Sequence, residues 1–203
     1  MDIPYHVEHF YKNIPTMSCD FLDVYEGQVK KAKSGDHFIE IGTSWGRSAA
    51  FMTTEIINSG KKIKFDTIDI FVAGGGASAA KVRKSLAPLG KHVNIIEADS
   101  SQHAEQYEDG SVDFIFIDGD HTYEGCKADI KAWYPKLRPG KLMAGHDFCD
   151  RELDNGDPPY GVRSAVLDFC DENNLKWSLA REPRGGIHNC WAIVKTIVKK
   201  KTP

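Results

Sequence analysis

The chain has 203 residues, of which 41% are hydrophobic and 27% charged. At roughly 100–200 residues per domain, this length predicts one compact domain. The composition is ordinary for a globular protein and excludes a disordered, collagen-like or disulfide-scaffold chain. The 26 Lys and Arg residues against 29 Asp and Glu residues give a formal charge of −3. A chain with this charge has no overall positive field, which excludes non-specific electrostatic binding to nucleic acid or to an anionic membrane surface.

The cysteines and the apolar runs indicate a cellular compartment. The five cysteines are odd in number, widely spaced and without a C-x-x-C pair, which matches neither a zinc site nor a disulfide framework and favours a reducing environment. The first residues lack the basic and apolar segments of a secretory signal, and no run reaches the ~18 apolar residues of a membrane helix. We therefore expect a soluble, cytoplasmic protein without membrane contact.

Three segments are expected along the chain. Residues 1–36 have a helical pattern outside any strand–helix repeat, so we expect a helical cap at 1–35. Residues 36–198 form the main domain, and 199–203 form a solvated basic tail. From residue 37, short β-branched runs alternate with amphipathic stretches, which is typical of a parallel sheet with helices on both faces.

The expected strands lie at 37–41, 64–69, 93–97, 112–117 and 141–145, and the helices between them at 47–59, 77–86, 101–107 and 123–137. Arg138-Pro139-Gly140 reads as the stop signal of the last of these helices. After a polar loop at 149–161 we expect a helix at 162–173 and a hairpin of strands at 175–180 and 190–195. The predicted fold class is α/β, a single Rossmann-like doubly wound sheet that is mostly parallel with an antiparallel C-terminal hairpin.

Open α/β sheets bind ligands at the carboxyl ends of their strands, so the loops that follow the strands are searched first. After the first strand, Gly42 and Gly46 allow a tight turn and close approach of a ligand. Glu40 stands where a dinucleotide fingerprint needs glycine, and its carboxylate would repel pyrophosphate but accept hydrogen bonds from an ammonium group. Asp69 ends the second strand, where its carboxylate can accept hydrogen bonds from ribose hydroxyls. Asp99 follows the third strand, where it could contact the edge of an adenine. Helix capping is the alternative for both aspartates.

These residues resemble the class I S-adenosylmethionine-dependent methyltransferases over about residues 36–195. The loop Glu40-x-Gly42-x-x-x-Gly46 resembles the first motif of that family, with Ser44 where the commoner form has glycine. Ile117-Asp118-Gly119-Asp120-His121-x-Tyr123 and Ala144-Gly145-His146-Asp147 are similar to a methyltransferase-domain subgroup near the metal-dependent catechol and sugar O-methyltransferases. The resemblance implies a seven-stranded sheet and S-adenosyl-L-methionine as cofactor. The cofactor-binding residues that it implies are Glu40, Gly42, Thr43, Ser44, Trp45, Gly46, Ser48, Asp69, Ile70, Asp99, Ser100 and Asp118.

An acid and histidine cluster is expected at the carboxyl ends of the fourth and fifth strands. Asp118 ends the fourth strand and His146-Asp147 end the fifth, so neighbouring strands about 4.8 Å apart would let these side chains converge. The candidate metal ligands are Asp118, His146 and Asp147, and the candidate catalytic residues are His121, Asp118 and His146. In the metal-dependent relatives, the position of His121 carries a lysine base. A histidine of ordinary pKa also accepts a proton near pH 7. Mg²⁺ is the ion of the metal-dependent relatives, but histidine is a poor Mg²⁺ ligand. Mn²⁺, Zn²⁺ and the absence of any metal therefore stay open beside Mg²⁺.

The resemblance and the cluster together predict methyl transfer to a hydroxyl oxygen of a small molecule or sugar. This transfer is an in-line displacement, for which the protein must align the oxygen, the methyl carbon and the sulfur. Two other hypotheses stay open. One is a catalytically silent module that binds S-adenosylmethionine or a nucleoside. The other is a nicotinamide-dependent oxidoreductase, which only the sheet type and Asp69 favour. The sequence does not name the acceptor, and a homo-oligomer stays open.

Overall fold

The computed structural model describes residues 6–15, 19–71, 77–153, 158–181 and 190–197. The chain divides into two compact units, Met1–Ser100 and Ser101–Pro203. The predicted hairpin connection at 182–186 and the predicted tail at 199–203 lie outside the described residues. The domain boundaries expected after residues 35 and 198 stay predictions. Among the described residues, no helix is long and apolar enough to cross a membrane, and no two of the five cysteines form a disulfide.

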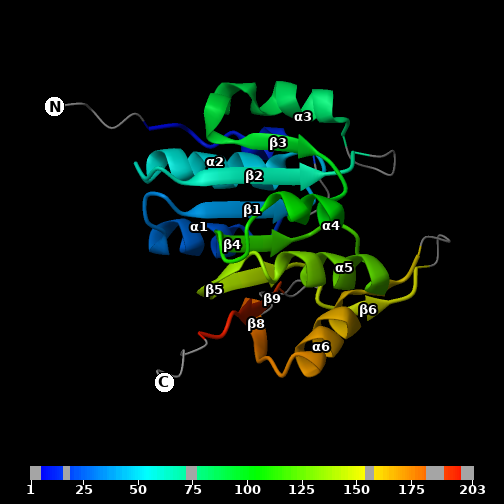
Figure 1. Cartoon of the computed structure of the whole chain (residues 1–203). Coiled ribbons are helices and arrows are strands. Elements are labelled where there is room, and N and C mark those ends of the chain that lie inside the picture. Colours follow the sequence, from blue (N-terminus) through cyan, green and yellow to red (C-terminus); the bar gives the residue numbers. More distant parts are fainter. Residues whose placement is uncertain (1–5, 16–18, 72–76, 154–157, 182–189, 198–203) are drawn as a thin grey trace, which may run out of the picture. The chain divides into compact units, whose positions relative to one another are not determined.

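The first unit is built on three parallel strands (Figure 1). β2 (Lys64–Asp69) lies between β1 (His37–Ile41) and β3 (Asn94–Glu97). Its helices are α1 (Leu22–Lys31), α2 (Arg47–Asn58) and α3 (Ala79–Leu86), with 3-10 turns at η1 (Tyr11–Asn13) and η2 (Ala87–His92). β1 ends level with β2, since Ile41 pairs with Ile68 and the Gly42 N–H donates to the Ile68 carbonyl at 2.9 Å. The loops after these two strands are therefore neighbours.

The N-terminal segment packs on the outside of α2. α1 contacts α2, the Val7 N–H donates to Asn58 Oδ1 at 2.8 Å, and Arg47 Nε donates to the Ile14 carbonyl at 2.6 Å. The expected helical character is found in α1 and in the η1 turn, while the other described residues before β1 are irregular. A cap over a ligand edge stays a prediction.

The second unit contains four strands of the main sheet and a small ribbon. β4 (Val112–Ile117) runs parallel to β5 (Leu137–Gly145), β9 (Cys190–Val194) pairs antiparallel with β5, and β8 (Trp177–Arg181) pairs antiparallel with β9. The ribbon is β6 (Asp150–Arg151) with β7 (Tyr160–Gly161). The seven main-sheet strands and their directions confirm the predicted fold class, including the antiparallel hairpin.

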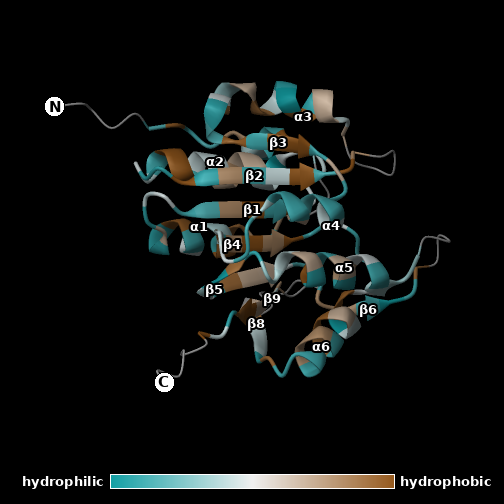
Figure 2. Ribbon diagram, viewed as in Figure 1, coloured by the Kyte–Doolittle hydropathy of each residue, from teal (hydrophilic) through white to brown (hydrophobic). Residues whose placement is uncertain are grey.

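The helices of this unit are α4 (Ser100–His103), the 3-10 turn η3 (Ala104–Gln106), α5 (Tyr123–Trp133) and α6 (Val162–Glu172). α5 and α6 pack side by side. Figure 2 shows hydrophilic and hydrophobic residues along both helices, as expected where one face of a helix meets the core. All six residues of β4 are buried, which explains why its sequence is almost continuously apolar.

The largest boundary errors are at the end of α5 and the start of β5, where the strand expected at 141–145 begins four residues earlier; the other expected helix and strand bounds differ by at most two residues. The helix expected to reach Leu137 ends at Trp133, and Leu137 already begins β5. The stop signal Arg138-Pro139-Gly140 therefore lies inside a strand. The register of β4 against β5 shifts between Val112 and Phe114, and Gly140 has a positive φ of 80°. This irregularity lets the strand continue past the proline, which cannot donate a ladder hydrogen bond.

Two glycines differ sharply in what a methyl group would meet. At Gly145, an added Cβ would lie 2.5 Å from the Ile117 carbonyl oxygen and 2.5 Å from the Trp191 ring, whereas at Gly27, inside α1, nothing lies within 4 Å. Gly145→Ala should destabilise the protein by about 3 kcal/mol, because backbone and a buried indole would have to move. Gly27→Ala should stabilise it by about 0.5–1 kcal/mol, the helix propensity difference. Urea unfolding measures both, and equal midpoints for the two variants would contradict the packing at Gly145.

Candidate active site

The loop after β1 has a backbone that only certain residues tolerate. Gly42, Ser44 and Gly46 have positive φ angles of 92°, 51° and 84°. A Cβ at Gly46 would also lie 3.1 Å from Val82 Cγ1, so this position needs glycine on two grounds. Ser44, which replaces the expected glycine, keeps the left-handed conformation, at a cost of roughly 1–2 kcal/mol for an L-residue. The glycine-type turn is therefore present despite the serine.

Asp69 ties this loop to the end of β2. Its Oδ2 accepts hydrogen bonds from the backbone N–H groups of Thr43 and Ser44, both at 2.8 Å, and its Oδ1 accepts one from Phe71 at 2.7 Å. The N-cap of the following helix α3 is Ser78, so Asp69 does not act as a helix cap. The two oxygens of a carboxylate offer about four acceptor sites in all, so Oδ1, with one hydrogen bond, can accept a second one.

Glu40, next to last in β1, is buried beside the same loop. The residue is only 1% exposed to solvent. The Tyr25 hydroxyl donates to Oε1 at 2.7 Å, and the Thr67 hydroxyl donates to Oε2 at 2.6 Å. Thr67 also shares a 2.6 Å hydrogen bond with the Thr43 hydroxyl. Sequence analysis did not single out Tyr25 or Thr67, and the contact of Glu40 with a ligand ammonium group stays a prediction.

The other predicted cofactor residues lie around this loop within the first unit. Trp45 is half-buried, with Lys81 Nζ 5.7 Å from the centre of its ring, and Ser48 is buried in the first turn of α2. Ile70 is 51% exposed directly after Asp69. Apolar exposure beside a polar loop is typical of a ligand contact, but a single exposed apolar residue is common on any surface.

Asp99 and Ser100 lie at the end of β3, next to β2. Asp69 pairs with Glu97 in the register of these strands, and the Ala98 N–H donates to the Asp69 carbonyl at 3.0 Å. Asp99 directly precedes α4, which begins at Ser100. The three acidic positions predicted at consecutive strand ends, those of Glu40, Asp69 and Asp99, are thus on adjacent strands of one unit.

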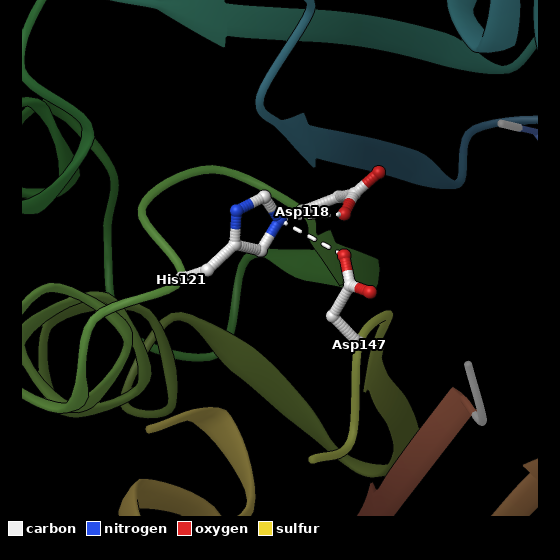
Figure 3. A group of neighbouring side chains, drawn as sticks. All are labelled: Asp118, His121 and Asp147. Carbon is white, nitrogen blue, oxygen red and sulfur yellow. Dashed lines mark hydrogen bonds and ion pairs between the residues drawn. The ribbon is translucent and has the colours of Figure 1, made fainter. Parts of the chain in front are cut away.

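Three side chains converge in the second unit (Figure 3). Asp118 follows β4, Asp147 follows β5, and His121 lies in the turn before α5; Figure 3 shows the ring and the two carboxylates gathered together. His121 Nε2 is 3.1 Å from Asp147 Oδ2 and 3.4 Å from Asp118 Oδ1. The backbone N–H of His146 donates to the Ile117 carbonyl at 3.1 Å. This bond brings the ends of β4 and β5 together, as predicted.

His146 lies beside both carboxylates, as predicted, and its role as a metal ligand or catalytic residue stays a prediction. It is 4% exposed, and its Nδ1 lies 3.2 Å from Asp147 Oδ2 and 3.7 Å from Asp118 Oδ1. The group of side chains that could share an ion is Asp118, His121 and Asp147, whose ligand atoms lie within 4.8 Å of one another. Two carboxylate oxygens and an imidazole nitrogen fit Mn²⁺ or Zn²⁺ better than Mg²⁺, which prefers oxygen.

The ring of His121 is held from outside the cluster. It stacks on Tyr160 with the ring centres 4.7 Å apart and the planes 12° from parallel, and the Gly161 N–H donates to the His121 carbonyl at 2.9 Å. Thr122 is the N-cap of α5, and its hydroxyl accepts from the Gly125 N–H at 3.1 Å. Asp120 accepts a hydrogen bond from the Thr122 N–H at 2.8 Å.

The charges of the cluster depend on one another. Burial by itself lowers the pKa of His121, but hydrogen bonds to Asp118 and Asp147 outweigh it and raise that pKa to about 10. Burial raises the pKa of Asp147, but hydrogen bonds from His121 and His146 outweigh it and hold the pKa well below the ordinary range. The expectation of an ordinary histidine pKa is therefore wrong for this arrangement. With only these side chains present, His121 is an imidazolium at pH 7 and has no lone pair with which to accept a proton.

A cavity of about 490 Å³ lies against the stacked ring of Tyr160. Residues of the ribbon β6–β7 and of the first turn of α5 line it, among them Thr122, Asp150, Arg151 and Tyr160. The Arg151 guanidinium lies 4.8 Å from the centre of the Tyr160 ring. Tyr160 is thus shared by the cavity and the stack on His121. The sequence predicts a polar loop at 149–161, and the structure places the short ribbon β6–β7 within it.

The model of the family described as "Methyltransferase domain" matches residues 39–148, which is more than half of the chain. The chain belongs to this family. The matched region runs from β1 to just beyond Asp147 and includes both the loop after β1 and the acid and histidine cluster. The class I S-adenosylmethionine-dependent methyltransferase recognised from the sequence is confirmed at the level of this domain.

Individual proteins add the fold and a partial sequence match. The uncharacterised protein y4gI of Sinorhizobium fredii is 44% identical over 63 residues, which is 31% of this chain, and the match spans only 7% of that protein. An O-methyltransferase of Bacillus cereus in complex with SAH is 23% identical with a TM-score of 0.61, covering 91% of this chain and 86% of its own. An O-methyltransferase of Thermotoga maritima is 15% identical with a TM-score of 0.61, covering 94% and 70%. At these identities the two structures show the fold.

Proposed function

We propose that this chain transfers the methyl group of S-adenosylmethionine to a hydroxyl oxygen of a small-molecule or sugar acceptor, with a divalent cation at Asp118, His121 and Asp147. The observation that carries the proposal is the convergence of these three side chains after β4 and β5 in a chain of the methyltransferase domain family. The O-methyltransferases among the solved structures of the same fold support oxygen as the acceptor atom.

The first unit supplies the proposed cofactor site. The Asp69 carboxylate would accept hydrogen bonds from the ribose hydroxyls while it holds the loop through Thr43 and Ser44. Asp99 and Ser100 would face the adenine. S-adenosylmethionine supplies the methyl group on a positively charged sulfur. The remaining task of the protein is alignment, because an in-line displacement needs the reacting atoms at roughly 3–3.5 Å.

The second unit supplies the proposed acceptor site. A bound divalent cation would lower the pKa of the acceptor hydroxyl, so that its proton passes to water and the oxygen attacks the methyl carbon as the carbon–sulfur bond breaks. Asp118 and Asp147 would hold that cation, with His121 as a third ligand. The cavity of about 490 Å³ next to Tyr160 has the volume of small-ligand sites, roughly 300–1,000 Å³. Its lining combines tyrosine and proline with Asp150, Arg151 and Ser164, whose polar groups could bind the hydroxyls of an acceptor.

The experiment is isothermal titration of SAH into the protein, once with EDTA and once with Mn²⁺. We expect micromolar SAH affinity, about −8 kcal/mol, and a separate heat for Mn²⁺ that is lost in the Asp118→Asn variant. No SAH binding in either buffer would refute the cofactor assignment. SAH binding without any Mn²⁺ heat would refute the cation and leave a methyltransferase that uses none.

His121→Ala tests the cluster in turnover. Once an acceptor is found by screening hydroxylated small molecules, methyl transfer by this variant should fall by about 10²–10⁴-fold, the usual contribution of acid–base or metal assistance. The affinity for SAH should stay within about twofold, because all other proposed cofactor residues except Asp118 lie in the first unit. Radiolabelled methyl transfer and SAH titration give the two readouts. Unchanged turnover would remove His121 from the mechanism.

A further inference from the structure

A tyrosine of the N-terminal segment reaches the underside of the cofactor loop. Tyr25 lies in α1, is 0% exposed, and packs edge-on against Phe21 with ring centres 5.3 Å apart. Its hydroxyl donates to Glu40 Oε1 at 2.7 Å. A fully buried phenol ring has little conformational freedom, so the position of this donor is fixed by the packing of α1.

From Tyr25 the hydrogen bonds continue without a gap to the loop. Glu40 Oε2 accepts from the Thr67 hydroxyl at 2.6 Å, and Thr67 shares a 2.6 Å hydrogen bond with the Thr43 hydroxyl. The backbone N–H of the same Thr43 donates to Asp69 at 2.8 Å. Thr43 is therefore held on one side by the Tyr25–Glu40–Thr67 chain and on the other by Asp69.

The loop needs this support because its backbone is not a default conformation. Gly42, Ser44 and Gly46 all have positive φ, and Ser44 is strained there. Strained backbone persists only where its surroundings fix it. A buried carboxylate such as Glu40 is stable only when hydrogen bonds satisfy it, and bonds to a charged group are stronger than neutral ones. The two hydroxyl donors thus anchor Glu40, and Glu40 anchors the loop.

We propose that Tyr25 is a positioning residue of the cofactor site: with Thr67 it holds Glu40, and through Thr67 and Thr43 it fixes the loop Gly42–Gly46 in the shape that binds the S-adenosyl group. The proposal rests on the proposed function for the identity of the ligand. It gives α1 a role in cofactor affinity in addition to packing on α2. Glu40 then acts through the loop and not by direct contact with the cofactor.

The test combines a readout without ligand and one with SAH. Amide hydrogen exchange of Thr43 and Ser44, followed by NMR, reports on the loop alone. In Tyr25→Phe these amides should exchange about tenfold faster, and the Kd for SAH should rise about tenfold, the effect of losing one hydrogen bond to a charged group. Thr67→Val should act in the same direction, whereas Thr67→Ser, which keeps the hydroxyl, should stay within about twofold of wild type. Tyr134→Phe in the second unit is the matched control and should change neither readout.

The possible outcomes separate the two proposals. Wild-type loop exchange in Tyr25→Phe overturns the positioning role, whatever SAH does. A wild-type protein that does not bind SAH refutes the proposed function, while the exchange rates still decide the role of Tyr25. If Tyr25→Phe does not fold, the Thr67→Val and Thr67→Ser pair decides in its place. In a Glu40→Gln background, Tyr25→Phe should add less than twofold to the SAH Kd; a further tenfold loss would show that Tyr25 acts by a route other than Glu40.

Discussion

Asp147→Asn is expected to reduce methyl transfer by about 10²–10⁴-fold and to abolish the Mn²⁺ heat, while SAH binds as in wild type. Two imidazole rings face this one carboxylate: His121 Nε2 is 3.1 Å from Oδ2, and His146 Nδ1 is 3.2 Å from it. The amide of asparagine keeps the size of the side chain but removes the negative charge that attracts a cation and both rings. It also keeps the backbone, because Asp147 has a positive φ of 50°, a conformation that Asn tolerates well.

The control for this prediction is Asp109→Asn. Asp109 forms a 2.7 Å ion pair with Lys136, and its own side chain is 72% exposed; exposed pairs of this kind contribute about 0–1 kcal/mol. Turnover of Asp109→Asn should therefore equal that of wild type. Circular dichroism at the assay temperature shows that both variants are folded. A folded Asp147→Asn protein with wild-type turnover would remove the cluster from the reaction.

The elements that were predicted with correct boundaries are those whose pattern has one physical interpretation. β1, β2 and β4 match at both ends, because each is a short segment that contains apolar or β-branched residues and is too short for a helix of ordinary length. The segment Arg138-Pro139-Gly140 has two physical interpretations. A proline followed by a glycine can end a helix, but the same pair also fits a strand that contains a bulge. The second holds here because the preceding helix ends earlier, at Trp133. The ribbon of β6 and β7 has two residues per strand, too few for any periodicity.

The site divides in the same way. Asp69, Asp99, Asp118 and Asp147 could be predicted as candidates because strand ends in an α/β sheet are where ligands bind, and that rule needs only the order of elements. Tyr25, Thr67 and Tyr160 were missed because their partners lie 15, 27 and 39 positions away in the sequence, at Glu40, Glu40 and His121. One signal was available: Thr67 is a polar residue in the middle of a buried strand, where a hydroxyl needs a partner. The raised pKa of His121 depends on distances that no sequence pattern contains.

Asp69→Asn is expected to weaken SAH binding by about 100-fold or more, equal to ~2.7 kcal/mol. The Asp69 carboxylate already accepts three backbone hydrogen bonds, from Thr43, Ser44 and Phe71. An asparagine has only one oxygen, so its NH₂ group must face at least one of these N–H donors. The loop therefore loses a tie, and the ribose hydroxyls lose acceptor positions. Because both losses act on the bound cofactor, the effect should exceed that of Tyr25→Phe.

The matched control is Glu97→Gln. Glu97 pairs with Asp69 in the register of β2 and β3 and is exposed, so this variant removes a carboxylate from the neighbouring strand without touching the loop. Its SAH affinity should stay within about twofold of wild type, since the exposed Glu97 side chain forms no hydrogen bond or ion pair with the described residues of the loop. Titration calorimetry on both variants decides between local and general effects of charge. An equal loss of SAH affinity in Asp69→Asn and Glu97→Gln would mean that the negative charge near the loop, and not the hydrogen bonds of Asp69, governs cofactor binding. Wild-type affinity in Asp69→Asn would remove Asp69 from the cofactor site and return the loop after β1 to a purely structural role.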